Sequence, residues 1–148
     1  LAALGDLEKA DPQDGFLPEL RGQILFENGH IADAVTAYAL ALKLLPDNDL
    51  ARINLAQAYL ETRGDNRDLD KAIDALNRAK QTESRTPLLY RLLATAYGRS
   101  GREGLAKLAL AEEALLKNDK NFAVSQAKQA QDLLPMRETA AQQRARDI

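Results

Sequence analysis

The sequence predicts an all-α protein built from antiparallel helix pairs. Apolar residues recur at helical spacing along most of the chain, short clusters of turn-forming residues interrupt them, and the pattern repeats. Gly22 and Ala56 lie 34 residues apart, and so do Leu25 and Tyr59. A period of this length is typical of stacked helix pairs, each of which buries its apolar face against its neighbours.

The repeat length changes once along the chain. The interval is 38 residues between Tyr59 and Tyr97, and it returns to 34 between Ala72 and Ala106. The segment RGDNRDLD, residues 63–70, is rich in turn formers and can hold the extra residues in a loop. The insertion therefore lengthens a connection without moving the apolar face of a helix.

We expect about seven to eight helices. The first four are expected at 16–27, 31–44, 50–62 and 69–81. Asn28 and Gly29 form the turn between the first two. Asp49 and Asp68 precede the third and fourth, where a carboxylate can accept hydrogen bonds from free N–H groups of the opening turn.

The remaining helices are expected at 86–99, 103–117, 121–134 and 137–147. Thr86 followed by Pro87 is typical of a helix start, because proline fits the first helical position. Gly101 and Asn118 lie in breaks between helices, and Pro135 follows the end of another.

We divide the chain into three parts. Residues 1–12 are interpreted as the end of a preceding repeat helix, residues 13–135 as an array of about 3–4 repeats, and residues 136–148 as a C-terminal capping helix. Ala123 follows Ala106 by half a period, so the helix GLAKLALAEEALLK is expected to serve two neighbouring pairs. It is apolar on two faces, as a helix between two others should be.

Small residues are expected where paired helices cross, because helix axes approach to about 8–10 Å only over small side chains. The first helices supply Gly22, Ala56 and Ala94. The second helices supply Ala34, Ala72 and Ala106, with Tyr38, Leu76 and Leu110 filling the space beside them.

Composition excludes several functions. The chain has 148 residues, 20 basic and 22 acidic, and no block of Lys or Arg, which argues against nucleic acid and anionic membranes as partners. It has no cysteine, so disulfides and thiolate metal sites are excluded. The longest apolar stretches are too short to span a membrane.

The repeats resemble the tetratricopeptide repeat (TPR), whose pattern is W-x2-L-G-x2-Y, then A-x3-F, then P, on a 34-residue period. The third repeat carries Tyr90, Leu93, Ala94 and Tyr97 at the first four of these positions. Pro18 and Arg52 at the aromatic position, and Arg21 at the leucine position, depart from the pattern. The resemblance implies a right-handed superhelix of helix pairs that binds protein.

A narrower resemblance rests on ELRGQILFENGHIADAV, on the LALAE core of residues 103–117 and on the terminal RARDI. These segments look like the C-terminal TPR region of bacterial HExxH zinc metalloproteases of the periplasmic beta-barrel assembly-enhancing type. The resemblance implies a non-catalytic docking domain in the periplasm or cell envelope, with outer-membrane assembly machinery and client proteins as partners. Zinc is then expected only in an upstream protease domain, since HExxH needs two histidines and this chain has one.

Two alternatives stay open. One is a free-standing TPR adaptor or assembly factor, which could be cytoplasmic. The other is a small hydrolase with an unrecognised site, which an activity screen with and without zinc would reveal.

The chain offers few candidates for chemistry, and we predict no catalytic residue, no metal ligand and no cofactor within it. His30 is interpreted as a solvated turn residue. Glu112 and Glu113 are adjacent on a helix and point in different directions, so they are interpreted as solubilising residues. Asp65, Asp68 and Asp70 are interpreted as capping residues, because they lack the spacing of a calcium loop.

The predicted site is a protein-binding groove along the first helix of each pair, by comparison with TPR families. It mixes apolar anchors, amides and both charges, which suits an extended or helical peptide. Its expected residues are Glu19, Leu20, Gln23, Phe26, Glu27, Ile53, Asn54, Gln57, Leu60, Glu61, Arg91, Leu92, Thr95 and Arg99.

Overall fold

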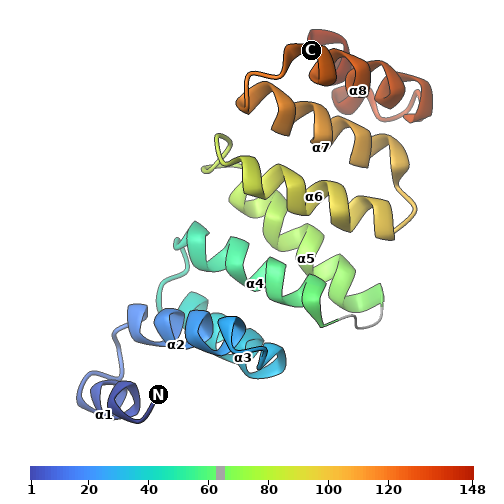
Figure 1. Ribbon diagram of the computed structural model, residues 1–148. Coiled ribbons are helices and arrows are strands. Elements are labelled where there is room, and N and C mark those ends of the chain that lie inside the picture. The colour runs from blue at the N-terminus through green and yellow to red at the C-terminus, as the bar shows by residue number, and fades with distance from the viewer. Residues whose placement is uncertain (63–65) are drawn as a thin grey trace. The chain divides into compact units, whose positions relative to one another are not determined.

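The computed structural model describes residues 1–62 and 66–148, and these ranges form nine helices and no strand (Figure 1). The bounds are α1 (Ala2–Ala10), α2 (Phe16–Glu27), α3 (Ile31–Leu44), α4 (Asp49–Glu61), α5 (Asn66–Ala79), α6 (Pro87–Arg99), α7 (Glu103–Leu116), α8 (Lys120–Leu133) and α9 (Thr139–Asp147). The all-α fold class is confirmed. The count exceeds the expected seven to eight because the first residues form a helix of their own, α1.

The helices gather into two compact units, which we call unit 1 (Leu1–Thr82) and unit 2 (Glu83–Ile148). In unit 1, α2 packs against α3 and α4 packs against α5, while α2 and α3 both contact α4. This is the expected order of consecutive helix pairs. The turn between α2 and α3 is centred on Gly29, whose φ of +78° is a conformation that glycine adopts without steric cost.

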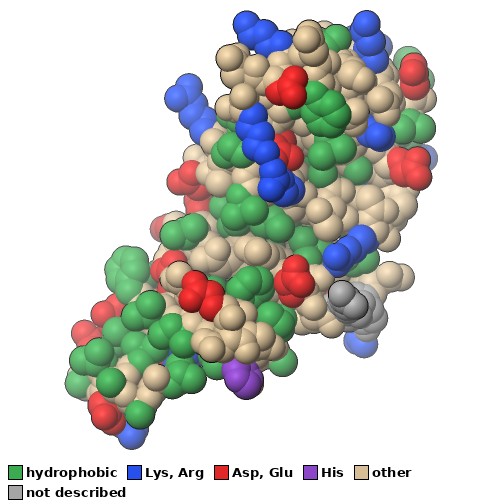
Figure 2. Space-filling model, viewed as in Figure 1, with side chains coloured by type: hydrophobic (Ala, Val, Ile, Leu, Met, Phe, Trp, Pro, Cys, Tyr) green, Lys and Arg blue, Asp and Glu red, His purple; other side chains and the backbone are tan. Residues whose placement is uncertain are grey.

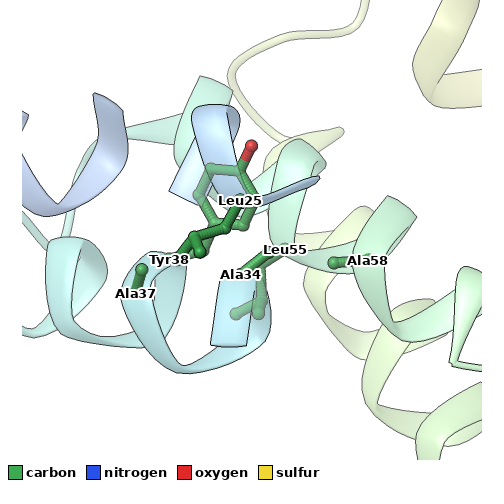
Figure 3. Packing of buried hydrophobic residues seen from close by; sticks show 6 residues of the cluster. All are labelled: Leu25, Ala34, Ala37, Tyr38, Leu55 and Ala58. Atoms are coloured by element: carbon green, nitrogen blue, oxygen red, sulfur yellow. The ribbon is translucent and has the colours of Figure 1, made fainter. Parts of the chain in front are cut away.

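The crossing of α2 and α3 explains the glycine at position 22. A Cβ atom added there would lie 2.7 Å from two ring atoms of Tyr38, which is 2% exposed. The ring packs in an apolar cluster shown in Figure 3. The cluster comprises Leu25, Ala34, Ala37, Tyr38, Leu55 and Ala58. The expected role of Gly22 and Ala34 as small residues at the crossing is confirmed.

Unit 2 is arranged around α7, which packs against both α6 and α8. The expectation that this helix serves two neighbours is confirmed. The small residue at its crossing with α8 is Gly104, where an added Cβ would lie 3.0 Å from Leu134. Ala106 and Leu110, which we expected at the crossing of α7 with α6, are partly buried.

Two expected helix caps differ from the structure. Asn48, one residue before Asp49, is the N-cap of α4, and its Oδ1 accepts a hydrogen bond from the Ala51 N–H at 3.0 Å. Asp49 instead pairs with Arg52. Asp68 lies inside the first turn of α5 rather than before it, where a carboxylate still interacts favourably with the helix dipole.

The first helix is tied to the second by an ion pair. Arg21 Nε donates to Glu8 Oε1 at 2.8 Å and to Oε2 at 3.0 Å. Hydrogen bonding from Arg21 lowers the pKa of Glu8, outweighing the opposing effect of burial. Leu4 is the buried residue that α1 contributes to this contact region, so the ion pair adds to a small apolar contact.

Docking of α1 should therefore weaken in acid. Because the folded-state pKa of Glu8 lies below its ordinary value of 4.5, the contribution of the pair is complete above that value. It is lost as the pH falls through the lowered pKa. Hydrogen exchange of the α1 amides, corrected for intrinsic rates, should show protection lost as the pH falls below the ordinary pKa of a glutamate.

Glu8→Gln is the matched control for this pH dependence. Its α1 should be less protected at neutral pH and should show no further step in acid. A variant whose pH profile matches the wild type would contradict the assignment of this pair as the tie.

Candidate functional site

The face of α2 carries one accessible part of the predicted groove. Leu20 is 47% exposed, Gln23 and Glu27 are exposed, and Glu19 and Phe26 are half-buried. Gln23 Nε2 donates to Glu27 Oε1 at 3.0 Å. The face thus presents one apolar side chain flanked by an amide and two carboxylates.

The carboxylates of this face also act on the core behind it. Burial raises the pKa of Tyr38 to about 12, and the charges of Glu19 and Glu27 contribute to the rise. The phenol therefore stays protonated at neutral pH. Asn48 Nδ2 donates to Glu19 Oε2 at 2.6 Å, which links the face of α2 to the start of α4.

Three predicted groove residues do not lie on an accessible surface. Ile53 is 2% exposed, Leu60 is 3% exposed and Leu92 is 8% exposed, so a ligand cannot reach their side chains. We correct their assignment to packing residues. The other predicted groove residues of α4 are accessible: Asn54 and Gln57 are half-buried, and Glu61 is exposed.

On α6 the predicted residues Arg91, Thr95 and Arg99 are exposed. Arg91 is already engaged, because its Nη2 lies 2.6 Å from Glu113 Oε1. Thr95 Oγ1 donates to the Arg91 carbonyl oxygen at 3.1 Å. Arg91 is therefore a tie between α6 and α7 as well as a surface cation.

Glu113 and its neighbour Glu112 are each 7% exposed, so their interpretation as solubilising residues is wrong. Burial raises the pKa of Glu113, but hydrogen bonds from Lys117 and Arg91 outweigh it and the net pKa is lowered. Lys117 Nζ lies 2.6 Å from Glu113 Oε1. Glu113 is thus a buried carboxylate that remains ionised because two cations hold it.

Glu112 is likewise held by a cation, which belongs to the C-terminal helix α9. Its Oε2 accepts a hydrogen bond from Arg144 Nη2 at 2.7 Å, which joins α7 to α9. Gln142 Nε2 donates to the Leu134 carbonyl oxygen at 2.7 Å and adds a second polar contact to α9. The sequence signal that could have revealed both glutamates is their position in a helix apolar on two faces.

The described residues hold no group of three or more His, Cys, Asp or Glu side chains that could bind a metal ion. His30 is exposed and precedes α3, and its side chain makes no capping hydrogen bond. Asp65, which we expected to be a capping residue, lies outside the described residues. Among the same residues, none of the helices has both the length and the hydrophobicity of a membrane span.

Comparison with known proteins agrees with the repeats. Residues 22–62, which cover the second half of α2 and all of α3 and α4, match the family model described as TPR repeat. A structure described as the crystal structure of MamA is similar, with a TM-score of 0.75 and 20% sequence identity. The match covers 99% of this chain and 80% of that one.

No curated protein matches the sequence. At this identity the structural match shows the fold alone. The chain therefore has the TPR-type fold of stacked helix pairs, the class of fold that the repeat pattern predicts.

Proposed function

We propose that this chain is a non-catalytic module that binds protein through the first helices of its pairs. The observation that carries the proposal is the accessible face of α2, where exposed Leu20 lies among Gln23 and two carboxylates. An apolar side chain with convergent polar groups suits a peptide held by side-chain contacts. In unit 2, exposed Arg91, Thr95 and Arg99 form a second accessible stretch on α6.

The more specific proposal is a docking domain of a zinc metalloprotease of the cell envelope. Its support is the sequence resemblance of ELRGQILFENGHIADAV and the LALAE helix. Zinc and its ligands would then belong to the protease domain, and the partners would be outer-membrane assembly machinery and client proteins. A free-standing TPR adaptor, in the envelope or the cytoplasm, is the alternative.

Site-specific crosslinking tests the binding face. A photoreactive amino acid replacing Leu20 on α2 should give covalent adducts with a protein partner in the source cells. The control is the same replacement at Leu40 on α3, because Leu20 is 47% exposed and Leu40 is 48% exposed in the same repeat. Adducts at position 20 and none at position 40 are the expected result.

Equal adducts at both positions, or none at either, would contradict the assignment of the α2 face. Thermal unfolding of each variant separates loss of binding from loss of fold. Both replaced side chains are about half exposed, so neither replacement should change the fold.

The parent protein is tested separately. An antibody against this domain, applied to fractionated source cells, reports the mass and compartment of the native protein. A band well above 16.3 kDa in the envelope fraction, containing zinc, supports the protease proposal. A cytoplasmic band near 16.3 kDa overturns it and leaves the adaptor.

A further inference from the structure

Unit 1 contains an apolar hollow beside the predicted groove. It lies between the start of α2 and the α3–α4 connection and has a volume of about 540 Å³. Leu45 and Pro46 contribute to its wall, and Phe16 and Leu50 lie at its edge, 65% and 61% exposed. Exposed side chains of this size facing one hollow indicate a place for an apolar ligand group.

Other parts of unit 1 also expose apolar side chains. In Figure 2, hydrophobic side chains gather over α1 and the start of α2, at the lower left of the view. Leu7 of α1 is 55% exposed and Leu20 of α2 is 47% exposed. Unit 1 therefore exposes large apolar side chains on α1 and α2 in addition to those that line the hollow.

Local hydrogen bonds hold the walls in place. Asp14 Oδ1 accepts the Phe16 N–H at 2.9 Å, which sets the start of α2. Asn48 donates to Glu19 and caps α4, so the two sides of the hollow are joined. Gly15 lies so close to Leu45 that an added Cβ would be 2.6 Å from its Cγ. A ligand would therefore meet a preformed surface rather than order one, which lowers the cost of binding.

The side chains that line the hollow carry only negative charge, and Arg52, which donates to the carbonyl oxygen of Pro46 at its wall, is paired with Asp49. The polar lining of the hollow consists of Glu19, Asp47 and Asn48, with no Lys or Arg. Neither carboxylate takes part in an ion pair with the residues that the structure describes. Unit 1 as a whole carries 14 acidic and nine basic residues, whereas unit 2 carries eight and 11.

We propose that this hollow binds a peptide segment of a partner protein in which a large apolar side chain is flanked by Lys or Arg. The apolar side chain enters between Phe16 and Leu50, and the flanking cations lie near Glu19 and Asp47. Charge complementarity of this kind selects basic over acidic partners. The hollow adjoins the peptide-binding face of α2 and shares Glu19 with it, but its test uses Phe16 and Leu50, which lie outside that face.

The chain has no tryptophan, so a tryptophan-containing peptide reports its own binding by fluorescence. The probe is acetyl-Lys-Lys-Trp-Leu-Lys-Lys-amide. Two matched peptides replace every Lys by Glu, or the Leu by Ser. We expect the basic apolar peptide to bind, the acidic one not to bind, and the affinity of the first to fall as salt screens the carboxylates.

Two substitutions locate the bound peptide. Phe16→Ser or Leu50→Ser should weaken binding about tenfold, because each removes a large apolar contact. Leu40→Ser is the control, since Leu40 is 48% exposed on α3 and does not line the hollow. Thermal unfolding of each variant verifies that the fold is retained.

Three outcomes would overturn the proposal. The first is equal binding of the basic and acidic peptides. The second is unchanged affinity in both hollow variants. The third is concentration-dependent self-association of the wild type that Leu50→Ser abolishes while peptide binding is absent, because a second copy of the chain would then be the occupant.

Discussion

Replacing Gly22 by alanine should lower the free energy of unfolding of unit 1 by about 1–2 kcal/mol. The added Cβ would lie 2.7 Å from the Tyr38 ring, closer than carbon atoms pack. The ring is 2% exposed and enclosed by the core cluster, so α2 and α3 must separate to make room. Overpacking of this kind costs about 1–3 kcal/mol. The higher helix propensity of alanine offsets about 0.5–1 kcal/mol of this cost.

Gly98→Ala is the matched control for this substitution. Gly98 lies in α6, and an added Cβ there would meet no atom within 4 Å. It should gain the same helix propensity without a clash, so unit 2 should become slightly more stable. Chemical denaturation of both variants measures the difference, and equal effects of the two would show that α2 and α3 do not cross at Gly22.

Replacing Arg144 by leucine should release α9 from unit 2. The Arg144 side chain is 46% exposed, so its removal leaves little buried surface unfilled. Glu112, however, is 7% exposed and would be left without its cation. Leaving a buried carboxylate unpaired costs about 1–3 kcal/mol. Unfolding of unit 2 should begin at lower denaturant concentration, and amides of α9 should exchange faster.

A second substitution tests the cause of this loss. Glu112→Gln in the Arg144→Leu background removes the unpaired charge and should recover part of the stability. Arg146→Leu is the control on the same helix, because Arg146 is exposed. If Arg146→Leu destabilises as much as Arg144→Leu, or if Glu112→Gln recovers nothing, the pair is not what holds α9.

Much of the local structure was predictable from the sequence. The bounds of α2 and α3 agree with the expected ranges 16–27 and 31–44, because Gly29 marks the turn and apolar residues recur on one face. The start of α6 at Pro87 follows from the Thr86-Pro87 pair. The two-sided character of α7 was also visible, since a helix apolar on two faces must have two neighbours.

The candidate site was predicted less completely. Helical periodicity shows that Ile53 and Leu60 share a face of α4 with Asn54 and Gln57, but it does not say how many helices surround α4. In unit 1, α4 contacts α2, α3 and α5, so more of its circumference is buried than a two-helix contact would bury. Burial depends on all the neighbours of a helix together.

The sequence by itself determined the helices, their order in pairs and the small residues at the main crossing, because these depend on local backbone preferences and on a repeat that can be counted. Only the tertiary structure decided the roles of Glu112 and Glu113. Their partners Arg144 and Arg91 lie 32 and 22 residues away in the chain. Lys117 lies four residues from Glu113 on the same helix, but only the packing of α6 and α9 against α7 brings Arg91 and Arg144 to these two carboxylates.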